Sequence, residues 1–488
     1  MQSLMTRRGA GVLLHPISLP GPRAFGEIGR EARNFVDFLA AAGFSVWQML
    51  PLGPTGADRS PYQSTSAFAG NPELIDLDML VDIGWLQSDD IYVAGLSRRK
   101  LLRKACRCVQ EQEAAEQREN FTAFVDQHAY WLQDFALFTV LRYEANGVAW
   151  TQWPETLKRR DPTALAAAEG RLAEEMLYIQ FEQFVFFQQW NDLRNYAHER
   201  NVSLVGDLPF FVSHDSADVW AYPEGFQLNK LGEPAVVAGV PPDYFCATGQ
   251  HWGNPQYAWE HMRSTGFSWW RARVDHQQHL VDVLRVDHFR GFAATWVIPA
   301  ENETAEHGQW VASPGEELLG HLQSDFGELP WIAEDLGTIT PDVDTLRQKF
   351  HLPGMKILQF AFDSDASNPY LPHNHDPNCV VYTGTHDNDT SCGWYVQLSA
   401  ETEGKLRDYY ALTETAMPWT LIQSALRSVA QLAVVPMQDL LQLDSDARMN
   451  IPGTVNSNNW SWRFDWEQVP QPLAARLRHL VGIYGRLS

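Results

Sequence analysis

The chain has 488 residues, 45% of them apolar, and a formal net charge of −23. So acidic a surface repels phosphate backbones and multiply anionic substrates, which excludes nucleic acid and favours a neutral substrate. No apolar run reaches the roughly 18 residues of a membrane helix, so no membrane partner is expected. The five cysteines form no C-x-x-C pair, which predicts reduced thiols and a cytoplasmic location, and the oligomeric state stays open.

Along the chain, short apolar runs alternate with amphipathic helical patterns. Such runs are typical of strands that are buried on both faces of a parallel sheet. We predict eight strands: Val12–His15, Ser45–Leu50, Ser203–Asp207, Val281–Val286, Trp331–Glu334, Met355–Phe360, Val380–Gly384 and Leu432–Met437. The predicted helices are Arg30–Ala42, Glu175–Glu199, Ser268–Gln277, Pro341–Phe350 and Glu403–Ser428. Together they predict an α/β fold, a TIM (β/α)8 barrel that forms a single catalytic domain over residues 1–488.

One interval, approximately residues 72–190, is too long for a simple crossover between the second and third strands. It contains charged amphipathic segments at Arg98–Gln117 and Thr163–Met176. We therefore predict a mostly helical insertion subdomain here, with the basic residues of the first segment on a solvated helix face. Loop insertions are expected at the C-terminal face of the barrel, and a closing helix over Pro470–Leu487.

Acidic residues follow five of the predicted strands, at the ends where barrel enzymes carry their active sites. These acids are Asp207, Asp287, Glu334 with Asp335, Asp387 and Asp439. A single acid after a strand is often only a helix cap or a turn residue. Five acid-bearing ends repel one another unless they serve chemistry, bind a cation or are neutralised by bases. Candidate neutralising bases lie beside them: Arg285, Arg290, His288 and His386.

Three chemistries compete for this site. A metal centre is disfavoured, because the pair His373-x-His375 precedes a strand instead of following one. Phosphate chemistry is disfavoured, because GPRAFGEIG does not match the Gly-rich phosphate loop. Retaining glycoside chemistry needs two carboxyl groups about 5 Å apart and groups that hold a sugar, and the strand ends supply both. We therefore predict no cofactor and no metal.

Eight motifs carry a resemblance to one family, and the match runs from Pro16 to about Phe464, essentially the whole chain. They are SPYQSTSAFAGNP, GDLPFFVSHDSADVW, GVPPDYFCATGQHWGNP, LRVDHFRGF, AEDLG, GTHDND, RMNIPGT and NNWSWR. In these motifs the chain resembles the amylomaltase, or disproportionating enzyme, family of 4-α-glucanotransferases. The resemblance implies a barrel that transfers segments of α-1,4-glucans and maltooligosaccharides between chains without a cofactor.

The resemblance also implies catalytic roles, residue by residue. Asp287 looks like the nucleophile that forms a covalent glucosyl ester, and Glu334 like the general acid/base. Asp387 looks like the third acid, which holds sugar hydroxyls and stabilises the transition state. Arg285, two residues before the nucleophile, is expected to keep Asp287 ionised.

The remaining residues that the resemblance implies are expected to bind substrate. At the cleaved sugar these are Tyr62, Asp207, His288 and His386. On the acceptor side they are Gln250, Trp252 and Asn459, and a glucan-guiding loop would carry Tyr244 and Phe245. Asp335 is interpreted as structural, because adjacent strand residues point to opposite faces, and we assign no catalytic role to Asp389 or Asp439.

Three alternatives stay open from the sequence. A plain α-glucan hydrolase would use the same acids and release only shorter products. A non-catalytic glucan-binding barrel would need a broken acid set, whereas all three acids are present. A metal-dependent hydrolase would lose activity when a chelator is added.

Overall fold

The eight predicted strands form a closed parallel barrel. The structure, a computed structural model, describes residues 7–56, 58–92, 96–111, 115–242, 247–413 and 416–487. Around the barrel the strand order is β1-β12-β11-β10-β9-β6-β3-β2. The strands are β1 (Gly9–Leu13), β2 (Val46–Gln48), β3 (Ser203–Leu208), β6 (Val283–Val286), β9 (Trp331–Ala333), β10 (Gly354–Ile357), β11 (Cys379–Tyr382) and β12 (Leu432–Pro436). The predicted TIM barrel is confirmed.

Nearly every side chain of these strands is buried. Helices cover the outer face and neighbouring side chains fill the interior, which explains why the runs are continuously apolar. Several predicted strands extended one to three residues too far at their C-terminal ends. Glu334, for example, lies just beyond β9 instead of in it. The predicted acids therefore lie at the junctions between the C-terminal ends of the strands and the loops that follow them.

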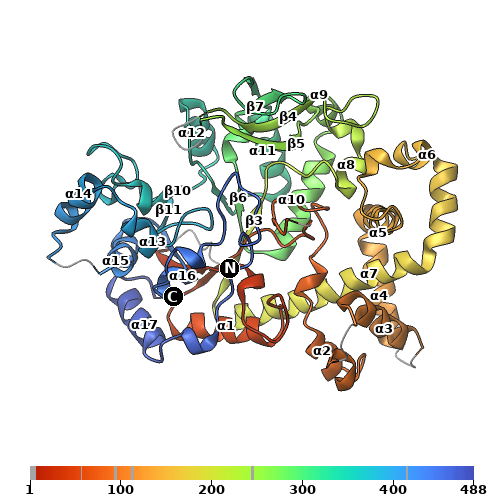
Figure 1. The fold of residues 1–488 in the computed structure, drawn as a ribbon, viewed down its shortest axis with the longest axis horizontal. Helices are drawn as coiled ribbons and strands as arrows, with labels where there is room; N and C mark the ends of the chain where they lie inside the picture. The colour runs from red at the N-terminus through yellow and green to blue at the C-terminus, as the bar shows by residue number, and fades with distance from the viewer. Residues whose placement is uncertain are drawn as a thin grey trace.

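Helices follow the barrel strands and pack around them (Figure 1). They are α1 (Arg30–Ala41), α8 (Ala217–Ala221), α9 (Trp259–Ser264), α10 (Ser268–Leu280), α11 (Gly315–Phe326), α12 (Pro341–Lys349), α13 (Ser391–Val396), α14 (Ala400–Tyr410), α15 (Trp419–Arg427), α16 (Met437–Leu440) and α17 (Leu473–Ile483). The prediction of one helix over Glu403–Ser428 is wrong, because α14 ends before Ala411, which has a left-handed φ of 52°. Pro418, which has no N–H to donate, then precedes α15.

The long interval between β2 and β3 is helical, as predicted, and lies to the right in Figure 1. Its helices are α2 (Leu77–Asp82), α3 (Arg98–Glu111), α4 (Ala115–Gln127), α5 (Ala129–Glu144), α6 (Glu155–Lys158) and α7 (Pro162–Glu199). The last of these begins earlier than predicted, because the Asp161 side chain accepts the N–H groups of Thr163 and Ala164, and Pro162 occupies the first turn. It packs against α1, α10 and β3, so the insertion is anchored directly on the barrel.

A second, antiparallel sheet was not predicted (Figure 1, top). Its order is β5-β4-β7-β8, and its strands are β4 (Val236–Val240), β5 (Gln250–Pro255), β7 (Ala294–Pro299) and β8 (Gln309–Ala312). Only loop insertions were expected here, so that prediction is incomplete. The strands come from the connections after β3 and β6, which places this sheet beside the carboxyl ends of the barrel strands. Among the described residues, no helix is long and apolar enough to cross a membrane.

Candidate active site

Register brings three acids and one arginine to neighbouring positions. In the barrel Asp207 of β3 pairs with Arg285 of β6, and Val286 pairs with Ala333 of β9. One residue further along, just past the ends of β6 and β9, Asp287 and Glu334 therefore stand side by side; neighbouring strands lie about 4.8 Å apart. The ladder continues past the strand ends, since the Glu334 N–H donates to the Val286 carbonyl over 3.0 Å.

The Glu334 carboxyl group is held by two backbone donors. The His288 N–H lies 2.6 Å from Oε2, and the Leu336 N–H lies 3.1 Å from Oε1. His288 has a left-handed φ of 52°, a conformation uncommon for a non-glycine residue and often found at functional sites. Burial raises the pKa of Glu334 to about 8; the charge on Asp287 adds to the rise, and Arg285 and the two N–H groups oppose it. The group is therefore mainly protonated at neutral pH.

Arg285 supplies the positive charge between two acids. One guanidinium nitrogen lies 2.6 Å from Asp207 Oδ2 and the other 3.0 Å from Asp287 Oδ1. Arg285 and Asp287 are two residues apart, so their side chains point to the same face of β6. The Asp207 side chain is fully buried, whereas that of Asp287 keeps 29% of its surface exposed. Asp287 is thus ion-paired and also open to a substrate.

Tyr62 and His386 extend this network across the barrel mouth. The Tyr62 hydroxyl donates to Asp207 Oδ2 over 2.8 Å and lies 2.9 Å from His386 Nε2. Since the hydroxyl has a single proton, His386 Nε2–H is assigned as the donor to its oxygen. The two rings stack with centroids 5.4 Å apart. Burial lowers the pKa of His386, so the imidazole is neutral and carries one N–H donor and one nitrogen acceptor.

Asp387, the third predicted acid, is positioned by residues to which the sequence analysis gave no role. Asn450 Nδ2 donates to its Oδ1 over 2.6 Å, and Arg448 Nη2 donates to its backbone carbonyl, also over 2.6 Å. Trp460 packs against the rings of both Tyr62 and His386. All three lie in the motifs RMNIPGT and NNWSWR, which were the only sequence signal for them.

The predicted acceptor-side residues have different environments. Trp252 of β5 donates to Gln250 Oε1 over 3.1 Å and meets the His288 ring edge-on, with centroids 4.9 Å apart. His288 Nε2 is buried and has no partner among the described residues, which leaves it available to a ligand. Asn459 is buried, and its amide binds Thr454 and the Ile451 N–H, so it shapes its own loop. Tyr244 and Phe245 lie outside the described residues.

Three further acids near the strand ends make structural contacts. Asp335 accepts the Met355 N–H over 2.7 Å, on the opposite side of the chain from Glu334, as its place in the sequence predicts. Asp439 accepts from the hydroxyls of Thr383 and Ser391. Asp389 accepts from Ser445 over 2.7 Å.

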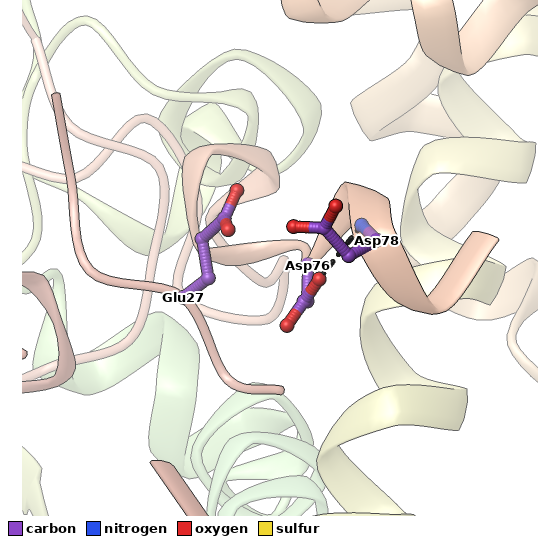
Figure 2. A group of neighbouring side chains, drawn as sticks. All are labelled: Glu27, Asp76 and Asp78. Carbon is purple, nitrogen blue, oxygen red and sulfur yellow. Dashed lines mark hydrogen bonds between the residues drawn. The ribbon is translucent and has the colours of Figure 1, made fainter. Parts of the chain in front are cut away.

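One acidic cluster elsewhere has the spacing of a metal site. Figure 2 shows Glu27, Asp76 and Asp78 as neighbours, and ligand atoms from the three lie within 4.8 Å of one another. The oxygens are already engaged, however, because Arg23 and Arg98 pair with Glu27, and Arg23 also pairs with Asp78. The Asp76 carboxylate caps the start of α2 and accepts the Arg30 N–H. We therefore interpret the cluster as an ion-pair network.

Comparisons with known proteins point to one family. The family model described as 4-alpha-glucanotransferase matches residues 14–468. A 4-alpha-glucanotransferase of Thermus thermophilus is 47% identical over 98% of this chain and 99% of its own. A chloroplastic/amyloplastic 4-alpha-glucanotransferase of Solanum tuberosum is 44% identical over 99% of this chain and 87% of its own.

The chain belongs to the 4-alpha-glucanotransferase family. A solved amylomaltase from Streptococcus agalactiae, in complex with acarbose, superposes with a TM-score of 0.95 at 37% identity and covers 99% of this chain and all of its own. A Corynebacterium glutamicum amylomaltase shares the fold, with a TM-score of 0.78 at 19% identity. The predicted family and the predicted 4-α-glucanotransferase activity are confirmed.

Proposed function

We propose that this 4-α-glucanotransferase works by a retaining, two-step transfer on Asp287 and Glu334. In the first step the Asp287 carboxylate attacks the anomeric carbon of the donor glucan. The glycosidic bond breaks, Glu334 gives its proton to the departing oxygen, and a covalent glucosyl ester forms on Asp287. In the second step the Glu334 carboxylate takes the proton of an acceptor 4-hydroxyl, whose oxygen attacks the same carbon and releases Asp287.

The observation that carries this proposal is the contrast between two adjacent carboxyl groups. Asp287 is ion-paired with Arg285 at 3.0 Å and keeps 29% of its side-chain surface exposed. Glu334, just past the end of the neighbouring strand β9, has a pKa raised by burial and starts as the acid. An ion-paired, partly exposed carboxylate next to a buried carboxyl group that holds its proton is the arrangement that this chemistry requires.

The surrounding residues suit a neutral sugar. Tyr62, Asp207 and His386 form a hydrogen-bonded row beside Asp287, and Asp387 directly follows His386 in the loop after β11. We propose that Tyr62, His386 and Asp387 hold the hydroxyls of the cleaved sugar, and that Trp252 with Gln250 contacts the acceptor. Asp207, which was also expected to bind sugar, has no exposed side-chain surface and instead holds Tyr62 and Arg285 in place. α-1,4-Glucans and maltooligosaccharides are the proposed substrates. The four cysteines that the structure describes are free thiols, which supports the proposed cytoplasmic location.

The pH dependence of transfer follows from the pKa of Glu334. We expect kcat/KM to hold up to about pH 8 and then to fall about tenfold per pH unit, because the acid must carry its proton in the first step. An ordinary glutamic acid, with a pKa of about 4.3, would already be almost fully ionised at neutral pH. Initial rates with maltotriose between pH 5 and 10 measure this profile. A rate that already declines above pH 5 would contradict the assigned environment of Glu334.

Product analysis tests the proposed function itself. Purified protein is incubated with maltotriose in the presence of a chelator, beside the variant Glu334→Gln, and products are separated by chromatography. Transfer gives glucose together with a ladder of longer oligosaccharides, and the variant gives neither. Shorter products without elongation would indicate the hydrolase alternative. A ladder that persists undiminished in Glu334→Gln would refute the assigned acid/base.

A further inference from the structure

One buried arginine near the site has no place in the proposed chemistry. Arg290 lies in the short helix η6 (Phe289–Phe292), three residues after Asp287, and only 6% of its surface is exposed. It makes no salt bridge with any residue that the structure describes. Its Nη1 instead donates to the backbone carbonyl of Thr338, in the loop that follows β9. Arg290 thus connects the loop after Asp287 to the loop after Glu334.

The hydrogen bond from Arg290 to the Thr338 carbonyl adds to the hydrogen bonds that hold Glu334 between the two loops. From the loop after β6, the His288 N–H binds Glu334 Oε2 over 2.6 Å, and the Phe289 N–H binds the Glu334 carbonyl over 3.1 Å. From Glu334's own loop, the Leu336 N–H binds Oε1. Arg290 reaches back from the first loop to Thr338 in the second. The separation of the two loops, and with it the place of the carboxyl, is therefore fixed from both sides.

The second sheet holds the Arg290 side chain in this orientation. The guanidinium carbon lies 3.7 Å from the ring centroid of Trp310, on the edge strand β8. Trp310 pairs with Trp296 of β7, and their rings meet at 63° with centroids 5.3 Å apart. Stacking on an aromatic face uses the planar shape of a guanidinium, which an ammonium lacks.

We propose that Arg290, stacked on Trp310, is a positioning residue that sets the Glu334 carboxyl beside Asp287 by holding their two loops together. The inference rests on the proposed function, in which Glu334 is the acid/base. It also gives the second sheet a task, because β8 supplies the ring on which Arg290 lies. Arg290 itself touches neither the reacting carboxyls nor, in this proposal, the sugar.

Loss of the Arg290 contacts between the two loops is expected to have two consequences. The Glu334 carboxyl departs from its reacting geometry, and a displacement of about 1 Å at a catalytic group costs up to about 100-fold in rate. The His288 and Leu336 N–H groups also bind the carboxylate less well, which raises the pKa of Glu334 further. The charged and titratable groups that face Glu334, namely Arg285, Asp287 and Tyr370, remain in place. Asp342, which faces Arg290, also remains.

The test compares Arg290→Met with Arg290→Lys and Trp310→Ala. The control is Arg271→Met, because Arg271 is a surface arginine of α10 that pairs with Asp325 of α11. We expect Arg290→Met to lower kcat about 10- to 100-fold with KM within about twofold, and to move the alkaline limb upward by about half a pH unit. Arg290→Lys recovers part of the rate, Trp310→Ala shows a smaller change in the same direction, and the control behaves as wild type.

Three outcomes would overturn the inference. One is an Arg290→Met enzyme with wild-type kcat. Another is a lowered kcat with an unmoved alkaline limb and no recovery in Arg290→Lys. The third outcome applies if Arg290→Met does not fold. In that case a Trp310→Ala enzyme with unaltered kcat and pH profile would overturn the inference. Glu334→Gln, measured alongside, separates the two proposals, because its full activity would refute the proposed function whatever Arg290 does.

Discussion

Replacing Asp287 with asparagine is expected to lower the kcat of glucan transfer by about 10³-fold or more, because the amide cannot attack the anomeric carbon. Asparagine has the same shape, so KM and the thermal unfolding midpoint should change little. Initial rates with maltotriose, measured over a range of concentrations, give both constants. The expected signature is a loss confined to kcat.

The control for this substitution is Asp275→Asn, on the exposed face of α10. Asp275→Asn makes the same chemical change at an exposed position outside the candidate active site, so it should leave the rate of transfer unaltered. If Asp287→Asn kept a tenth or more of the wild-type kcat, Asp287 would not be the nucleophile.

The second large effect is expected for Arg285→Met, which removes the cation shared by Asp207 and Asp287. A buried carboxylate that loses its partner costs about 3–5 kcal/mol in the free energy of unfolding. Asp207 has no exposed side-chain surface, and burial raises its pKa to about 7 even beside Arg285. It therefore takes up a proton when the cation is lost, and the stability loss should lie at or below the lower end of that range. Asp287 loses the ion pair that orients it at 3.0 Å, so kcat/KM should fall about 100-fold or more. Urea unfolding and maltotriose kinetics measure the two losses.

A double variant separates stability from catalysis. Arg285→Met combined with Asp207→Asn leaves no unpaired buried charge, so most of the lost stability should return. Activity should not return, because Asp287 still lacks its cation. If activity recovered together with stability, Arg285 would act only through the fold.

The barrel was predictable because burial on both faces leaves a direct mark on the sequence. Runs such as Leu432–Pro436 are apolar at nearly every position. The same rule predicts the candidate acids, since a strand that ends at Val286 places Asp287 at the barrel mouth. Opposite sides for Glu334 and Asp335 likewise follow from strand alternation.

Contacts between distant loops left no such mark. The strands of the second sheet are short and contain glycine and proline, so the sequence shows no alternation of polar and apolar residues there. Asn450 reaches Asp387 from 63 residues away, and Tyr62 reaches His386 from 324 residues away. These pairings depend on how the barrel brings loops together, and motif resemblance was the only sequence signal for them.

The covalent ester on Asp287 is open to direct observation. Glu334→Gln is mixed with α-maltotriosyl fluoride, whose fluoride leaves without an acid, so the first step proceeds and the second lacks its base. Mass spectrometry of the intact protein and of its peptides then locates any adduct. We predict one maltotriosyl group per chain on the peptide that contains Asp287, absent when Asp287 is also replaced by asparagine. An adduct on another residue, or none while fluoride is released, would contradict the two-step mechanism on Asp287.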